Sequence, residues 1–236
     1  MILEIMDERK QGERARDYAY RVLRHNIITL RQPPATVLNE AEISEQLEMS
    51  RTPIREALIL LREERLVDII PQRGSAVSLI SLHLASEGYF MRLALEIRML
   101  HELGGRLTAE QGRMLHQNIQ AQQEALERRQ GNVSAEFFAL DDEMHHMLYQ
   151  FCGRERVYES VSKMCTHYNR IRYLNTSVMG EAEQGQLLEQ HRTIYYYLTL
   201  GLPVGNEADQ FYEQHLGRWL KAARKVVEKF PEYFEE

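Results

Sequence analysis

Residues 47–74, LEMSRTPIREALILLREERLVDIIPQRG, contain the pattern of one amphipathic helix followed by a short hairpin. Ser50 can cap this helix, and Pro53 falls in the first turn, where a missing backbone N–H costs nothing. Apolar residues recur at helical spacing along one side, and arginines recur along another. The apolar row is Ile54, Ala57, Leu58 and Leu61, and the basic row is Arg51, Arg55 and Arg62. The helix therefore buries one side and offers guanidinium groups on the other.

Short elements flank this helix on both sides. Residues 42–48 suggest a preceding helix, residues 67–70 and 76–78 two strands, and residues 71–74 the turn between them. Two short helices and a hairpin predict a winged helix-turn-helix, whose second helix enters the DNA major groove. Arginine suits that role, because its planar fork can bond a guanine edge or a phosphate. The alternative is a solvated basic face on an ordinary helix.

The segments SRTPIREAL and PQRGSAV resemble the DNA-binding domain of the GntR family of bacterial transcriptional regulators, over about residues 18–81. The resemblance implies that residues at the helix start contact bases and phosphates and that the turn of the hairpin forms the wing tip. The predicted DNA-binding residues are Ser50, Arg51, Thr52, Arg55, Arg73 and Gly74. Ala41 stands where some relatives carry a basic residue, so their operator preference does not transfer directly.

Length and charge limit the functional classes. The chain of 236 residues has room for two domains, which we expect at 12–80 and 82–230, and its net charge of −6 argues against nucleic-acid binding through bulk charge. Residues 1–80 hold 12 Lys and Arg against 13 Asp and Glu, so any DNA contact must come from a local patch. Cys152 and Cys165 lack metal-type spacing and indicate buried thiols in a reducing cytoplasm. Without a long apolar run or a signal peptide, we expect a cytoplasmic protein with no membrane contact.

The remainder of the chain shows helical patterns. Residues 1–11 suggest a polar, frayed arm, and residues 14–30 a first helix. Glycine and proline divide the C-terminal part into about six long helices with short connections, which predicts an antiparallel bundle. These expected helices are 82–103, 108–130, 134–152, 154–177, 182–200 and 206–229. The predicted fold is mainly α, with an N-terminal winged helix-turn-helix and a C-terminal all-helical bundle.

Four polar side chains fall on inward-facing positions of three expected helices. Asp141 and His145 are four residues apart beside an apolar stripe, and His191 and His215 share faces with apolar residues. One carboxylate and three imidazoles could hold a divalent transition metal with positions left open. The alternative from spacing alone is a surface ion pair with two separate core histidines.

The patterns D-x-x-M-H-x-x-L at 141–148, QHRTI at 190–194 and EQHL at 213–216 resemble the FCD effector domain of FadR-type GntR regulators, over about residues 85–228. That resemblance implies a divalent metal of the zinc, nickel or manganese type. Its ligands would be Asp141, His145, His191 and His215. It also implies a small organic acid as effector, for which Arg92 and Arg172 are the candidate anion-binding residues.

Taken together, these patterns predict a homodimeric, ligand-responsive transcriptional regulator that reads a short palindromic operator. One rival function is a metal-dependent enzyme with an accessory domain, since a site with open positions could activate water. However, no spare residue has a clear general-base position. A second rival is a DNA-binding protein whose helical bundle is purely structural.

Overall fold

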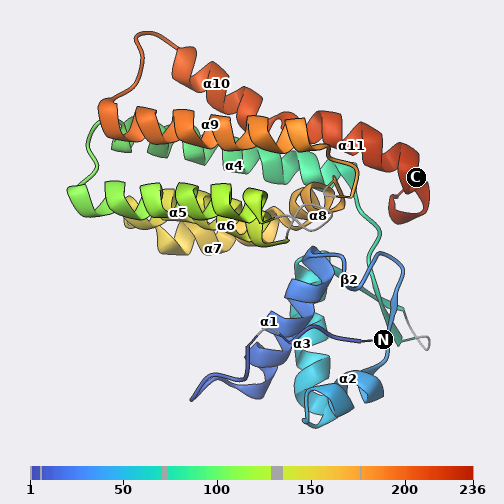
Figure 1. The fold of residues 1–236 in the computed structure, drawn as a ribbon. Helices are drawn as coiled ribbons and strands as arrows, with labels where there is room; N and C mark the ends of the chain where they lie inside the picture. Colours follow the sequence, from blue (N-terminus) through green and yellow to red (C-terminus); the bar gives the residue numbers. More distant parts are fainter. Residues whose placement is uncertain (1, 6, 71–73, 129–134, 176, 236) are drawn as a thin grey trace.

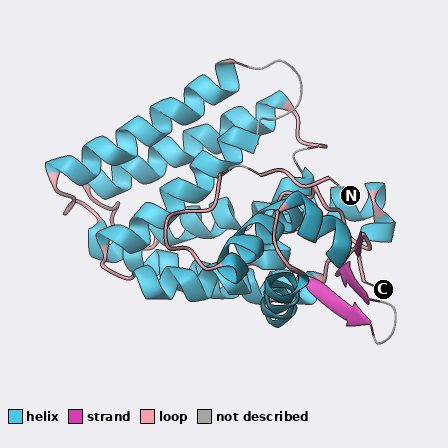
Figure 2. Cartoon of the chain, turned by 90° about the horizontal axis from the view of Figure 1, so that it is seen from below, coloured by secondary structure: helices cyan, strands magenta, loops and turns pink. Residues whose placement is uncertain are grey.

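The computed structural model describes residues 2–5, 7–70, 74–128, 135–175 and 177–235. A small N-terminal domain and a larger helical domain lie one below the other in Figure 1. Strands occur only at one end of the described molecule, as Figure 2 shows, and helices make up the rest. The predicted mainly α fold is confirmed. Within the described ranges, no helix is long and apolar enough to cross a membrane.

The N-terminal domain is built from three helices and a three-stranded sheet. The helices are α1 (Ala15–Ile28), α2 (Glu40–Gln46) and α3 (Arg51–Glu63), and the strands are β1 (Val37–Leu38), β2 (Val67–Ile70) and β3 (Gly74–Val77). The sheet is antiparallel with the order β1-β3-β2, and Val67 pairs with Val77. The apolar row of α3 is fully buried against α1, as its spacing predicts. The β2–β3 hairpin directly follows α3, at the place where the sequence predicts the wing of a winged helix-turn-helix.

The first residues of the chain are better anchored than their composition suggests. Leu3 is buried in the core of the N-terminal domain, and its backbone N–H donates to Gln46 Oε1 at 2.8 Å. The Glu4 N–H donates to Oδ1 of the buried Asn26, also at 2.8 Å. The expectation of a frayed arm is wrong for this segment, because one apolar side chain and two hydrogen bonds hold it against α1 and α2.

The helical domain contains eight helices in the described ranges, where six were expected. They are α4 (Leu82–Leu103), α5 (Ala109–Glu127), α6 (Ala135–Phe151), α7 (Glu155–Met164), α8 (Thr166–Asn175), α9 (Glu181–Leu200), α10 (Glu207–Leu216) and α11 (Arg218–Lys229). The additional breaks lie at Cys165 and Gly217, each inside a segment expected to be one helix. Glycine is a poor helix former, and Gly217 ends α10. Both breaks change where the side chains of the following helix point.

Close packing of α4 accompanies the break at Cys165. A Cβ atom added at Gly88 would lie 2.7 Å from the Met164 carbonyl oxygen and 3.0 Å from the Cys165 Cα. Only glycine therefore fits where α4 crosses the α7–α8 junction. The Cys165 thiol donates to the Gly88 carbonyl oxygen at 3.3 Å, which adds a hydrogen bond to this contact.

The start of α8 contacts the N-terminal domain. The Thr166 hydroxyl donates to the Glu64 carbonyl oxygen at 3.1 Å, at the end of α3. Both ring nitrogens of His167 are used: one lies 2.9 Å from the Arg65 carbonyl oxygen, and the other accepts the Ser81 N–H at 2.9 Å. The bonds to Glu64 and Arg65 join α8 to the turn between α3 and β2, and the bond to Ser81 joins it to the start of α4.

The segment between the two domains is fixed at two further points. The guanidinium of Arg170, on α8, donates to the carbonyl oxygen of Ser78 at 2.6 Å and to its hydroxyl at 3.1 Å. Ile80 pairs with the C-terminal tail, since its N–H donates to the Tyr233 carbonyl oxygen at 2.8 Å and its carbonyl accepts the Glu235 N–H at 3.1 Å. The linker is thus a hydrogen-bonded part of the structure.

Candidate functional site

The N-terminal half of α3 is exposed, as a DNA-reading helix requires. Arg51, Thr52 and Arg55 all lie on its solvent side. Arg55 donates from Nε to Glu40 Oε2 at 2.7 Å, an exposed contact that leaves its other donors available. Ser50 occupies the N-cap position, but its side chain makes no capping hydrogen bond, so the predicted cap is wrong in this detail.

The wing starts its return strand at Gly74, whose φ of +92° is a conformation that glycine adopts without strain. The residue is exposed at the start of β3. Arg73, the predicted basic tip, lies outside the described residues. DNA contacts by α3 and the wing therefore stay a prediction at the level of single residues.

Three histidines from three helices converge in the core of the helical domain. His145 on α6, His191 on α9 and His215 on α10 are all buried, and one ring nitrogen of each lies within 4.8 Å of the others. The closest approach joins Nε2 of His145 to Nε2 of His215 at 3.2 Å. These residues are far apart in the sequence, so only the fold brings them together.

Each histidine is oriented by a hydrogen bond from its second nitrogen, Nδ1, to a side-chain oxygen. A carboxylate or amide oxygen can only accept, so Nδ1 carries a proton, and in the neutral imidazole Nε2 then keeps its lone pair. The three pairs are His145 with Glu96 at 2.6 Å, His191 with Gln122 at 2.6 Å and His215 with Gln190 at 3.1 Å. Such outer partners are what metal-ligating histidines have in proteins.

Asp141, also on α6, lies beside the three histidines, next to His191. Its Oδ1 lies 3.0 Å from Nε2 of His191, while its Oδ2 accepts a hydrogen bond from Arg172 on α8. Arg172 also donates to Asp142 at 2.5 Å. The cation next to Asp141 outweighs the effect of burial, which alone would raise the pKa of this carboxyl, and holds that pKa well below its ordinary value. Asp141 is therefore an anion in the folded protein.

Converging lone pairs are the main electrostatic feature of this cluster. With the protons on Nδ1, the facing Nε2 atoms of His145 and His215 both present lone pairs at 3.2 Å. Within the described structure, Nε2 of His191 is buried without a hydrogen-bond partner, and the oxygen nearest to it belongs to a carboxylate. Like-charged atoms at such distances repel each other unless a cation lies between them. Three nitrogens and one oxygen suit a divalent transition metal.

Burial shapes the protonation of the cluster. Desolvation lowers the pKa of His191, although Asp141 opposes this effect. It lowers the pKa of His215 further, and the neighbouring His191 and His145 add to the shift. Burial alone would raise the pKa of the Glu96 carboxyl, but Arg92, His145 and Tyr212 outweigh it and bring the pKa to about 2. Neutral imidazoles beside ionised carboxylates are the protonation states that bind metals.

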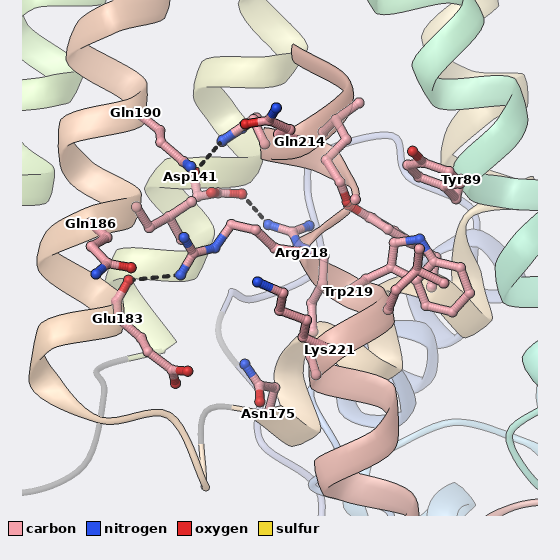
Figure 3. A pocket seen from close by; sticks show the side chains of 18 of the residues that line it. Tyr89, Asp141, Asn175, Glu183, Gln186, Gln190, Gln214, Arg218, Trp219 and Lys221 are labelled. Carbon is pink, nitrogen blue, oxygen red and sulfur yellow. Dashed lines mark hydrogen bonds and ion pairs between the residues drawn. The ribbon is translucent and has the colours of Figure 1, made fainter. Parts of the chain in front are cut away.

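A cavity of about 720 Å³ opens onto this cluster (Figure 3). Asp141, His145 and His215 line its inner end, and helices α4, α6, α8, α9, α10 and α11 contribute to its walls. Arg92 and Arg172, the predicted effector-binding residues, also line it. The side chains of both are engaged within the protein, Arg92 with Glu96 at 2.6 Å and Arg172 with Asp141 and Asp142.

Sequence reasoning missed the partners that orient the histidines. Gln122 lies in a polar, glutamine-rich segment, and yet its side chain is fully buried. Glu96 follows Arg92 by four residues and accepts a hydrogen bond from it. It also accepts hydrogen bonds from His145, at 2.6 Å, and from Tyr212, at 2.7 Å. The sequence offered one signal for these orienting partners, namely Gln190, which directly precedes His191 in the segment QHRTI.

Two known domain families match the two parts of the chain. Residues 15–77 match the family described as bacterial regulatory proteins, gntR family, and residues 87–201 match the FCD domain. The HTH-type transcriptional repressor RspR of Escherichia coli is 32% identical over 217 residues, which is 92% of each chain. The chain belongs to the GntR family of bacterial transcriptional regulators. It is accordingly a DNA-binding transcriptional regulator with an FCD domain, and the family consists of regulators rather than enzymes.

A further relative and two solved structures are similar to this chain over most of its length. A regulator from an unstable DNA locus of Streptomyces ambofaciens is 30% identical and covers 94% of this chain and 91% of its own length. Among solved structures, E. coli McbR/YncC matches 92% of this chain and 99% of its own, with a TM-score of 0.74 at 16% identity. A GntR regulator from Rhodococcus sp. RHA1 covers 90% and 97%, with a TM-score of 0.66 at 21% identity. These structures support the fold of the whole chain, winged domain included.

Proposed function

We propose that this GntR regulator responds to a small carboxylate effector that binds at a divalent metal held by Asp141, His145, His191 and His215. The observation that carries the proposal is the convergence of lone pairs, with Nε2 of His145 and of His215 only 3.2 Å apart. Each of the three Nδ1–H groups donates to an oxygen acceptor. Neutral histidines held in this way direct the Nε2 lone pairs toward one another, which is the arrangement that binds a metal cation.

The donor set limits the metal. Three imidazoles and one carboxylate favour zinc, nickel or manganese over calcium or magnesium, which prefer oxygen ligands. When bound, such a metal supplies a Lewis-acidic position that can accept an effector carboxylate. The residues around it bind and orient, and the cavity beside Asp141 gives a small acid access.

Arg92 and Arg172 support anion binding through the field they create at the inner end of the cavity. Arg172 neutralises Asp141, and Arg92 neutralises Glu96, so a divalent metal would leave the site with net positive charge. An anionic effector would compensate that charge. Direct contact of either arginine with the effector stays a prediction.

Helix α8 is the route by which we expect the effector to influence DNA binding. Its Arg172 bonds to Asp141 in the cluster, and its Thr166, His167 and Arg170 bond to the N-terminal domain and the linker. An effector must bind the DNA-competent and DNA-incompetent states with different affinity in order to shift their populations. A small displacement of α8 would change the relative pose of the two domains and provide that difference.

We further propose that the regulator acts in the cytoplasm as a homodimer on double-stranded DNA. Two symmetry-related recognition helices would read the two halves of a short palindromic operator. The free thiols of Cys152 and Cys165 agree with a reducing compartment. Sedimentation equilibrium and a footprint with twofold symmetry would test the dimer.

One experiment tests the central proposal. Metal content is measured in the purified protein, and the upstream DNA of its gene is used in gel-shift assays with metal-loaded and chelated protein, with and without small organic acids. We expect about one divalent ion per chain and a change in DNA affinity that requires both the metal and an acid. His191→Ala should abolish the response and keep DNA binding. Regulation by acids without a metal, or no bound metal together with no effect of this variant, would refute the proposal.

A further inference from the structure

Most charges at the cavity are already neutralised inside the protein. At its inner end, Arg172 is paired with Asp141 and Asp142. Nearer the mouth, Lys225 is paired with the carboxylate of Glu183 at 2.5 Å. These cations hold the cavity wall together, and none of them needs a ligand to balance its charge.

Arg218 is different. It starts α11, lines the cavity and is half-buried, and Figure 3 shows its side chain extending across the cavity toward α9. One of its terminal nitrogens donates to the Glu183 backbone carbonyl oxygen at 3.0 Å. Among the described residues, no carboxylate lies within ion-pair distance of its guanidinium, and the Glu183 carboxylate is paired with Lys225. A guanidinium has five N–H donors in a fixed fork, so most of them remain available.

Partial burial without a carboxylate partner makes the charged form of Arg218 less stable, which lowers its pKa. Burial lowers the pKa of Arg218, and the more distant Glu183 and Asp141 carboxylates offset only part of that effect. Arg218 is partly removed from water and has no carboxylate partner, so an anion that enters the cavity would stabilise its charge. The planar guanidinium matches the two oxygens of a carboxylate.

The cavity contains a second unmet polar group. Asn175, at the end of α8, is buried and lines the cavity, and its Oδ1 has no hydrogen-bond partner among the described residues. Buried amide oxygens without a partner are rare and are satisfied by water or by a ligand. The cavity, at about 720 Å³, is also larger than one acetate-sized group at the histidine cluster would fill.

We propose that Arg218 recognises the second carboxylate of a small dicarboxylate effector, whose first carboxylate faces the Asp141–histidine cluster. This inference rests on the proposed function and makes it more specific. Arg218 is then a specificity-determining residue that separates dicarboxylates from monocarboxylates of the same length. The paired Arg92 and Arg172 set the charge of the inner end, and the unpaired Arg218 receives the outer end of the ligand.

The test compares two forms of the protein, with and without the Arg218 guanidinium, and two forms of each ligand, with and without the second carboxylate. Metal-loaded wild type and Arg218→Met are titrated by calorimetry with matched acids: malonate against propionate, succinate against butyrate, and glutarate against valerate. Loss of a charge-assisted hydrogen bond weakens binding about tenfold or more. We therefore expect the wild type to bind one dicarboxylate at least about tenfold more tightly than its partner. The variant should lose that difference and bind the monocarboxylate as the wild type does.

Two further variants sharpen the result. Arg224→Met removes an exposed arginine from the same helix, outside the cavity lining, and should behave as the wild type. Arg218→Lys keeps the charge but loses the fork, so it should retain part of the preference. Equal binding of both acid classes by the wild type, or an unchanged preference in Arg218→Met, would overturn the inference and leave the metal–carboxylate proposal standing. Failure of the metal-loaded wild type to bind any of these acids would overturn both.

Discussion

Arg170 and Arg172 lie two residues apart on α8 and bond to different domains. Arg170 is fully buried and donates to Ser78 in the linker that follows the wing, whereas Arg172 donates to Asp141 beside the three histidines. One turn of helix therefore connects the candidate effector site to the DNA-binding domain through two charged groups. Neither arginine can shift along the helix axis without changing the bonds of the other.

Arg170→Met should loosen the linker and leave the metal site intact. The Ser78 carbonyl oxygen loses a donor, a change worth about 1–3 kcal/mol, but the variant also removes a buried guanidinium whose pKa burial lowers to about 9. We expect faster protease cleavage between residues 78 and 82 and an unchanged metal content. Arg172→Met is the matched control: it should keep the linker protected and weaken metal binding about 10- to 100-fold. Identical linker cleavage in wild type and both variants would refute the connection through α8.

Removing the metal should lower the thermal stability. At a metal concentration of about 100 times Kd, binding stabilises the folded state by about 2.7 kcal/mol, which corresponds to about 5–10 °C in Tm for a chain of this size. We expect that difference between zinc- or nickel-loaded and chelated protein in calorimetric scans. His191→Ala should show little or none of it, and His83→Ala, an exposed histidine on α4, should show all of it. A full metal-dependent shift in His191→Ala would exclude that residue as a ligand.

Stability should fall on mild acidification because of His167, at the interface between the domains. Burial, with help from Arg170, lowers the pKa of His167 from 6.5 to about 4. Between these values the unfolded chain binds a proton that the folded chain does not, so stability is complete above about pH 6.5 and decreases as the pH falls toward 4. The loss attributable to this residue is about 3 kcal/mol. Chemical unfolding of chelated wild type and His167→Gln at several pH values should show a shallower decrease for the variant, and parallel curves would contradict the assignment.

Arg51→Ala and Arg55→Ala should each weaken operator binding by about tenfold, because a bidentate arginine–base contact is worth about 1–3 kcal/mol. Fluorescence anisotropy with operator and scrambled duplexes would separate base contacts from phosphate contacts, since only the former change the ratio of the two affinities. Arg62→Ala, exposed on the last turn of the same helix, serves as the control and should have a smaller effect. If all three variants behaved alike, the predicted orientation of α3 in the groove would be wrong.

The sequence predicts the helices and the buried faces of this protein, but it does not predict the helix break at Gly217 or the side-chain partners of the histidines. The apolar row of α3 and the inward positions of three histidines follow from helical periodicity, because a helix that buries a stripe also buries any polar residue on it. The break at Gly217 does not follow, since a single glycine inside a helical pattern is usually tolerated. That break determines where Arg218 points, and so the proposed recognition residue has no signature in the sequence.

The partners of the histidines were hidden for a related reason. Gln122 belongs to a polar, glutamine-rich segment, and nothing local distinguishes the one glutamine that reaches His191 from its exposed neighbours. Contacts of this kind join residues far apart in the chain, and they depend on how α5 packs against α6 and α9. Periodicity describes one helix at a time and contains no information about such pairings.

Trp219, the one tryptophan of the chain, follows Arg218 and lines the same cavity. Its ring packs beside those of Tyr89 and Tyr168, with centroids 5.8 and 6.1 Å away, and is almost completely buried. Indole emission depends on the polarity around the ring, so an anion that enters the cavity changes the intrinsic fluorescence of the whole protein. The regulator therefore contains its own optical reporter, with which a library of acids can be screened without any label.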